Sequence, residues 1–218
     1  MKKYFSKILF AIICGMFIAS CGSGGSGKKL ATNGVLGDLP NLVLQKHLTD
    51  SIRNAEEEAA MRKLNPNKQS DWAKAMKIDE KFKLRKKTET EKYNAEVEKI
   101  KPTLIGKSIP VEVENGLGFE ITSSKIINAE SHGIQIELEL KITDVKAANI
   151  MRYAKQIYLT AQNIDKDGNQ IGSNGGYYVE ISDRANGATG IIKYYLGIYA
   201  RDAERFSNFA KIKFVKSK

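Results

Sequence analysis

A ten-residue stretch, 133-GIQIELELKI-142, decides the fold of the second half of this chain. Apolar residues occupy every second position from Ile134 to Ile142, and Gln, Glu or Lys fills each position between them. Successive side chains of a strand point to opposite faces, so this alternation predicts a β-strand with one buried and one wet face. A strand of that kind is typical of an antiparallel sheet.

Shorter alternating segments flank this strand on both sides, at 111–113, 119–122, 157–161, 177–181, 192–198 and 212–214. Asn-Gly and Asp-Gly turn signals separate several of them. Seven or eight short strands in about 105 residues predict a β-sandwich over residues 109–218. Residues 202–209 interrupt the strands as a short predicted helix, with Ala203, Phe206 and Phe209 facing inward.

The order of these features resembles the immunoglobulin-like domains found in many bacterial lipoproteins of uncharacterised role. The resemblance depends on the long alternating strand, on the hairpin Asp165-Lys166-Asp167-Gly168-Asn169 and on a Gly-containing turn before a tyrosine-rich strand. It implies an immunoglobulin-like antiparallel sandwich. No Cys pair and no core Trp of the antibody type occur in this half, so the antibody family itself is excluded.

Residues 46–108 predict a helical segment of two helices. The first covers residues 49–64 and ends before Pro66. The second starts at Ser70 or Asp71, contains no Gly or Pro up to Ile100 and is expected to end before Pro102. We expect an antiparallel helix pair with one end resting on the sandwich. The overall fold class is therefore a mainly β domain preceded by helices, α+β overall.

Residues 1–20 form a predicted secretory signal, with three Lys followed by a short apolar run over 8–19 that is too short to span a bilayer. Its end, Ile18-Ala19-Ser20-Cys21, resembles the lipobox of bacterial lipoproteins. In that family the chain is cut before the Cys, whose sulfur receives a diacylglyceryl group. The resemblance implies a membrane anchor at Cys21. Residues 21–45, which begin with six Gly and Ser after the Cys, are predicted to form a flexible tether.

Composition and motifs argue against catalysis. The chain has 218 residues, a net charge of +10, two Cys and two His, and the two His lie far apart in the sequence. No nucleophile elbow, phosphate loop or dinucleotide fingerprint occurs. We therefore expect no enzyme activity, no catalytic residue and no cofactor.

The hairpin at 165–169 spaces three oxygen ligands like the start of a calcium loop. An EF-hand loop needs Gly at its sixth position and Glu at its twelfth, where this chain has Gln170 and Gly176. A β-turn is the favoured interpretation, since Gly168 accepts positive φ, and we expect no metal site. Calcium stays open as the alternative.

Exposed tyrosines mark a candidate contact surface. Strand alternation places Tyr158, Tyr178, Tyr195 and Tyr199 opposite the main apolar face. Such a row could stack on sugar rings or contact a protein partner. The alternative is that each ring only covers sheet surface.

Five basic residues lie within seven positions of the second helix, Lys81, Lys83, Arg85, Lys86 and Lys87. Anionic lipid headgroups are one candidate partner for them. We expect no nucleic-acid partner, because an exported lipoprotein rarely meets nucleic acid. A solvated helix face balanced by nearby Glu is the third and favoured interpretation.

These observations predict a non-catalytic cell-envelope lipoprotein that binds or scaffolds another envelope protein. A glycan-binding lipoprotein using the tyrosine row is the second hypothesis, and an envelope hydrolase or enzyme inhibitor is the third. Gly22 after the Cys, in place of Asp, implies by the same lipoprotein resemblance delivery to the outer membrane. We expect the periplasmic face rather than the cell surface.

Overall fold

The computed structural model describes residue 30, residues 34–151 and residues 153–216. The predicted signal, Cys21 and about half of the predicted tether (residues 22–29 and 31–33) lie outside the described residues. The helices are α2 (Leu39–Met61), α3 (Gln69–Leu104), the 3-10 turn η1 (Ala200–Asp202) and α4 (Ala203–Phe206). The strands are β1 (Val111–Val113), β2 (Phe119–Glu130), β3 (Gly133–Ile142), β4 (Gln156–Asp165), β5 (Gln170–Glu180), β6 (Thr189–Gly197) and β7 (Phe209–Val215).

Helices and strands hold similar shares of the described residues, about 36% and 34%, so the fold class is α+β. The strands form two sheets, with the orders β1-β7-β4-β5 and β2-β3-β6. All neighbours are antiparallel except β1 and β7, which run parallel. One bridge, from Ile181 to Gly190, links β5 to β6 where the chain passes between the sheets.

The long alternating stretch is the central strand of the smaller sheet, as β3 pairs with β2 on one side and β6 on the other. Its five apolar side chains, from Ile134 to Ile142, are all fully buried, which confirms the predicted alternation. They share one apolar core with residues of the other sheet such as Ile157, Ile212 and Phe214. The predicted inward residues Ala203, Phe206 and Phe209 are also buried, although Phe209 begins β7 rather than ending a helix.

Helix α2 begins at Leu39, ten residues earlier than predicted, so the expected tether does not extend to residue 45. Pro40 suggested a break in the sequence, yet it lies in the first turn of α2. A helix tolerates Pro there because the missing N–H has no intrahelical acceptor in the first turn. Leu36 and Leu39 are fully buried, which explains why this part of the chain is ordered.

Helix α3 extends to Leu104 and contains Pro102, so the prediction that Pro102 ends the helix was wrong. Pro removes one backbone hydrogen bond, but the N–H of Ile105 still donates to the carbonyl of Lys101 at 3.0 Å. Leu104 is fully buried in the core shared with the sheets. Burial of that side chain offsets the lost bond and extends the helix by one turn.

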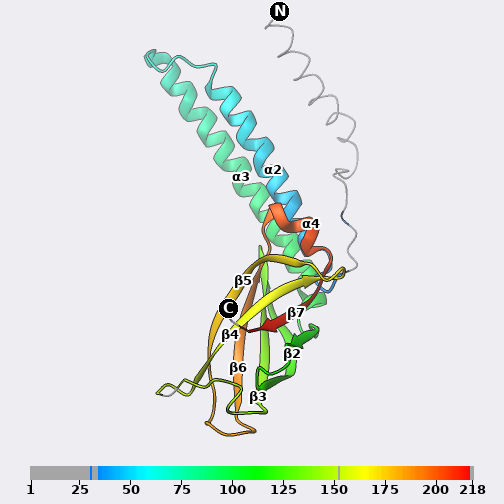
Figure 1. Cartoon of the computed structure of the whole chain (residues 1–218). Helices are drawn as coiled ribbons and strands as arrows, with labels where there is room; N and C mark the ends of the chain where they lie inside the picture. Colours follow the sequence, from blue (N-terminus) through cyan, green and yellow to red (C-terminus); the bar gives the residue numbers. More distant parts are fainter. Residues whose placement is uncertain (1–29, 31–33, 152, 217–218) are drawn as a thin grey trace, which may run out of the picture.

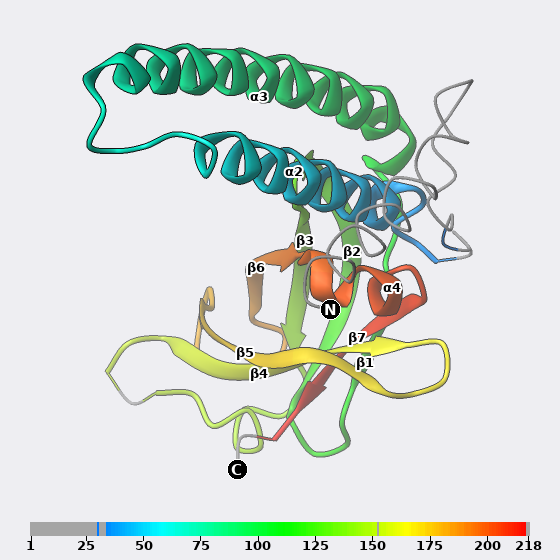
Figure 2. The same ribbon diagram turned by 90° about the horizontal axis from the view of Figure 1, so that it is seen from above.

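The two long helices form an antiparallel hairpin that stands on one end of the β module, residues 109–216 (Figures 1 and 2). This is the arrangement predicted from the sequence. Helix α3 contacts β2 and α2 contacts η1 and α4, and the buried Val43, Val97 and Leu104 belong to the same apolar cluster as the strands. The tip of the hairpin, around residues 62–72, lies far from the sheets (Figure 1).

The middle of the hairpin is held by charges rather than by apolar side chains. Arg53 of α2 is only 3% exposed, and its Nη1 lies 2.8 Å from Glu89 Oε2 of α3 and 2.6 Å from Asp50 Oδ1. Arg85 of α3 bridges Glu89 and Glu56. Burial acts to raise the pKa of Asp50, but hydrogen bonds from Lys46 and Arg53 outweigh it, so the pKa lies below its ordinary value. These ion pairs explain how residues 85–92 of α3, which include no apolar residue, still pack against α2.

Candidate functional site

The strongest candidate site lies at the end of the β module remote from the helices. Tyr158 of β4 and Tyr178 of β5 are direct cross-strand partners, with ring centroids 4.9 Å apart. Both rings are exposed, at 48% and 66%. Gly176 leaves room for the first ring, since a Cβ there would lie 2.0 Å from Tyr158 Oη. The Gly-Gly pair before the two tyrosines of β5 is therefore the local signal for this arrangement.

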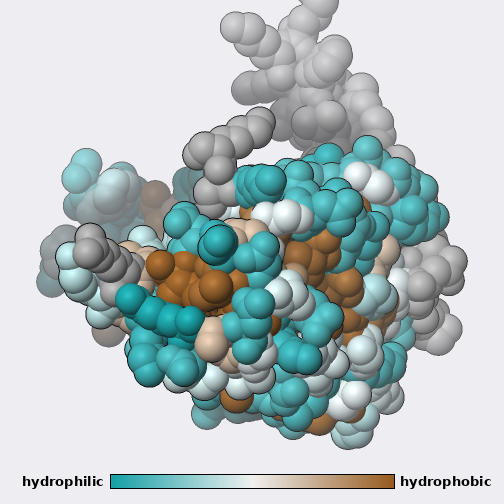
Figure 3. All heavy atoms as spheres, turned by 60° about the horizontal axis from the view of Figure 1, so that its bottom comes forward, coloured by the Kyte–Doolittle hydropathy of each residue, from teal (hydrophilic) through white to brown (hydrophobic). Residues whose placement is uncertain are grey.

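The tyrosine pair borders a hollow of about 420 Å³, which we call the tyrosine hollow. Its apolar lining comes from Phe119, Leu159 and Met151, and the turn before β2 and the loop after β3 complete it. Phe119 is held by an edge contact with Phe214, at 5.8 Å between ring centroids. Figure 3 shows this end of the molecule, with a compact apolar patch surrounded by hydrophilic side chains.

The chemistry of the tyrosine hollow is that of a contact surface. Lys216 is the one charged residue among the described residues that line it. Met151 is 42% exposed beside the two tyrosine rings. Aromatic residues and Met are enriched in the centres of protein interfaces, where charged residues other than Arg are depleted. The hollow can therefore take an apolar or aromatic group.

The other two predicted tyrosines lie at the opposite end of the β module. All four rings are exposed, as alternation predicted, but Tyr195 and Tyr199 belong to β6 and the segment after it, in the other sheet. The four tyrosines therefore form two separate groups and not one row, because β4 and β5 belong to one sheet and β6 belongs to the other. The guanidinium of Arg201 lies 5.7 Å from the Tyr199 ring centroid.

Tyr199 lines a second hollow, of about 510 Å³, at the junction between the hairpin and the β module. The fold brings His47 of α2 and His132 of the β2–β3 turn to this same hollow, although 84 residues separate them in the sequence. Tyr93 of α3 donates its hydroxyl to the carbonyl of Ser131, and burial raises the pKa of Tyr93 to about 12. This junction joins α3 to the strands, so we interpret it as structural.

The five predicted basic residues do not form one free face. Arg85 forms ion pairs with Glu56 and Glu89 inside the hairpin. Lys83 Nζ lies 2.7 Å from Asp79 Oδ2. Lys81, Lys86 and Lys87 are exposed and, among the described residues, make no ion pair. Three of the five are thus available to an anionic partner.

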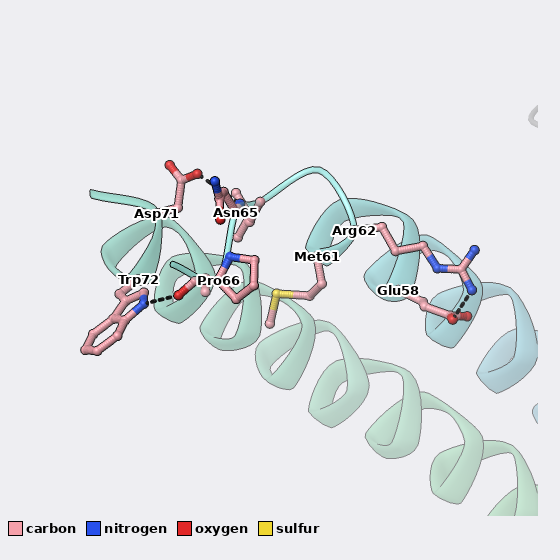
Figure 4. Close-up of a pocket in the computed structure, with 9 residues that line it drawn as sticks. Glu58, Met61, Arg62, Asn65, Pro66, Asp71 and Trp72 are labelled. Carbon is pink, nitrogen blue, oxygen red and sulfur yellow. Dashed lines mark hydrogen bonds and ion pairs between the residues drawn. The ribbon is translucent and has the colours of Figure 1, made fainter. Parts of the chain in front are cut away.

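The hairpin tip carries exposed apolar residues. Trp72 and Met76 are 62% and 68% exposed. Figure 4 shows the Trp72 indole directed away from α2, with its Nε1–H donating to the carbonyl of Pro66 at 2.9 Å. Met61 reaches between the two helices beneath the turn (Figure 4). Met61, Pro66 and Trp72 line a hollow of about 470 Å³. Trp72 and Met76 lie about one turn apart on a face of α3 that α2 does not cover.

Four carboxyl groups of the described residues favour their charged form. Asp50, Asp71, Glu112 and Asp165 have pKa values below their ordinary range. A general acid needs the opposite shift. Asp165 Oδ1 accepts the backbone N–H groups of Asp167 and Asn169, at 2.9 and 2.8 Å. This carboxylate is therefore engaged by its own hairpin turn, as expected for the turn interpretation.

Among the described residues, no group of three or more His, Cys, Asp or Glu could hold a metal ion. No helix in the described part of the chain has the length and apolar character needed to cross a membrane. In the comparisons with known proteins, no family model, no curated protein and no solved structure matches this chain.

Proposed function

We propose that this chain is an exported bacterial lipoprotein that is anchored through Cys21 and binds another cell-envelope protein without catalysing a reaction. The anchor is supported by the lipobox-like Ile18-Ala19-Ser20-Cys21 after a basic and apolar start. The two acyl chains of a diacylglyceryl group would hold the protein durably, because one chain alone binds a bilayer only marginally. We assign the protein to the periplasmic face of the outer membrane.

We also infer that the β module is a variant of the immunoglobulin-like sandwich. In sequence order, β2, β3 and β6 correspond to strands A, B and E, and β4, β5 and β7 to C, C′ and F. The neighbours match that scheme, including the F strand beside C. Strand β1 takes the place of the last strand, but it precedes the others and runs parallel to β7. The loops at the ends of such sandwiches commonly bind partners.

One observation carries the binding function, namely the exposed Tyr158–Tyr178 pair beside the tyrosine hollow. Two tyrosines, Met151 and an apolar floor meet at one site, on strands held by the core. Buried aromatic anchors dominate the energy of protein interfaces. The site also lies at the end of the β module opposite the hairpin, so a partner can reach it without touching the helices (Figure 1).

Site-specific photo-crosslinking in living cells tests this function. A photoreactive residue at position 178 should yield one discrete crosslinked protein, and the same residue at position 195, an exposed tyrosine in the other sheet, should not. Met151→Asp should abolish the product at 178 while leaving the thermal unfolding of the chain unchanged. Equal crosslinking from both positions would contradict the proposed partner site.

The anchor has an independent test. Wild-type cells should incorporate labelled palmitate into the chain, and Cys21→Ser should remove both the label and the membrane association. A Cys21→Ser chain that stays in the membrane fraction without any fatty acid would disprove the lipoprotein assignment.

Glycan binding is the second candidate function, and the same tyrosine pair favours it. The two ring planes are tilted by 55° to each other, so a sugar ring could stack on one tyrosine but not on both at once. Purified chain should then co-sediment with envelope polysaccharide, and Tyr178→Ala should prevent it. If the chain binds polysaccharide and no crosslinked protein is found, glycan binding replaces protein binding as the function.

A further inference from the structure

We propose that the distal half of the helical hairpin docks on the surface of an anionic bilayer. This inference rests on the proposed envelope location and adds a second membrane contact, independent of Cys21. We call the surface the tip stripe and define it as Trp72, Met76, Lys83, Lys86 and Lys87 of α3. The four positions 72, 76, 83 and 87 are spaced i, i+4, i+11 and i+15, so they share one face of the helix.

Charge differs strongly between the two arms of the hairpin. Residues 62–87, the turn and the first half of α3, contain ten basic and three acidic residues, whereas residues 39–61, which include all of α2, contain two basic and four acidic ones. The excess positive charge therefore lies on the turn and on the arm that carries the tip stripe. An anionic membrane surface attracts each nearby basic residue by about 1 kcal/mol, within the screening length of the salt.

The same end exposes the side chains that enter the headgroup region. Trp72, Met76 and Leu84 are each more than 60% exposed. Trp and Tyr concentrate at membrane–water interfaces, because their rings are amphipathic. The Trp72 ring is fixed by its hydrogen bond to Pro66, so it is directed outward before any contact forms. Lysines beside an exposed indole are the pattern of an interfacial helix face.

The ion pairs of the hairpin leave this surface available. Between the helices, Arg53 and Arg85 each form an ion pair with Glu89. On the outer face Lys83 is paired with Asp79, while Lys86 and Lys87 make no ion pair among the described residues. Two lysines and one indole are therefore accessible over a length of about 22 Å along α3.

The chain is long enough for the anchor and the tip stripe to reach one membrane. Helix α2 has 23 residues, which corresponds to about 34 Å. The twelve residues between Cys21 and Gly34 can span at most about 40 Å. A hairpin lying along the bilayer would place the tyrosine hollow at the free end of the molecule.

The single Trp of the chain makes the test direct, because its fluorescence reports on Trp72 alone. The full chain with Cys21→Ser, which carries no lipid, is mixed with vesicles of phosphatidylcholine or of phosphatidylcholine with 30% phosphatidylglycerol. We expect a blue shift and co-sedimentation with the anionic vesicles only, and release of the chain at high salt. Lys86→Glu with Lys87→Glu should weaken binding at least about tenfold.

A matched control separates this surface from overall charge. Lys166→Glu with Lys193→Glu makes the same charge change at two exposed positions of the β module and should leave binding unchanged. Trp72→Ala, followed by co-sedimentation, should also weaken binding. Equal losses from both charge pairs, or no binding to anionic vesicles, would overturn the inference.

The outcomes distinguish this inference from the proposed function. If palmitate labels Cys21 in cells but the purified chain does not bind anionic vesicles, only the docking of the tip stripe on a membrane is disproved. A crosslink from position 76 to a protein in place of lipid would likewise overturn it in favour of an acidic protein partner. If palmitate does not label the chain, the proposed function fails whatever the vesicles show.

Discussion

Gly118 joins the turn before β2 to the loop after β3, and it lies between Leu117 and Phe119, which both line the tyrosine hollow. Its φ is +72°, and its carbonyl accepts the N–H groups of Thr143 and Asp144, at 2.9 and 3.0 Å. A Cβ at this position would lie 2.3 Å from the nitrogen of Ala148 and 2.4 Å from the oxygen of Asp144. Both the conformation and the close backbone approach therefore require glycine.

Gly118→Ala should destabilise the chain by about 3 kcal/mol or more, because left-handed strain and a backbone clash add together. Gly106→Ala is the matched control, since Gly106 has φ of +84° and no atom within 4 Å of the added Cβ. Strain alone should cost that variant about 1 kcal/mol. Urea unfolding measures both changes. Equal losses would show that the backbone approach at Gly118 carries no cost.

At the scale of the element, the hairpin depends on one buried cation. Arg53 links α2 to Glu89 of α3 at the point where the helices have no apolar seam. Removing one partner of a buried pair leaves the other charge uncompensated, whereas replacing both by apolar residues is often neutral. The α2–α3 pairing should therefore depend on the pair as a unit.

Arg53→Met should lower the free energy of unfolding by about 3 kcal/mol, and adding Glu89→Met should restore only part of that loss, because Arg85 then loses its own ion pair with Glu89. Trp72 fluorescence during urea unfolding reports the unfolding of the hairpin in the single and the double variant. Arg62→Met is the control, because Arg62 and Glu58 form an exposed pair worth less than about 1 kcal/mol. If Arg53→Met costs no more than Arg62→Met, the charged seam does not hold the hairpin.

At the scale of the whole molecule, the hairpin base and the β module share one core. Leu36, Leu39 and Leu104 are fully buried against residues of the strands. Beyond Glu56 and Arg85, which face each other across the hairpin, few apolar side chains are buried. The proximal half of the hairpin is therefore part of the domain, and the distal half is an extension.

Replacing residues 57–84 by a four-residue Gly-Asn turn should leave the thermal midpoint within about 5 °C of the full chain, since this removes little of the core. Residues 109–218 alone should unfold at a much lower temperature, because each buried leucine lost from the core costs about 2–5 kcal/mol. Calorimetry of both chains checks this. A stable isolated 109–218 would show that the helices are a separate unit.

Local patterns determined much of this architecture. Alternation identified β3 and most other strands, and helical spacing identified α3, because each element buries one face with its own period. The turn at Asp165–Asn169 also followed from local chemistry, through Asp side chains and a Gly at positive φ. The start of α2 was missed, because the burial of Leu36 and Leu39 depends on distant strands.

The proposed N-terminal signal and the proposed anchor at Cys21 rest on the sequence alone, because these residues lie outside the part of the chain that the structure describes. Only the tertiary structure decided which tyrosines lie together. Alternation places a side chain on one face of a strand but does not say which strands become neighbours, so Tyr158 meets Tyr178 while Tyr195 lies in the other sheet. The same reason applies to Trp72, because helical spacing does not say which face of α3 meets α2.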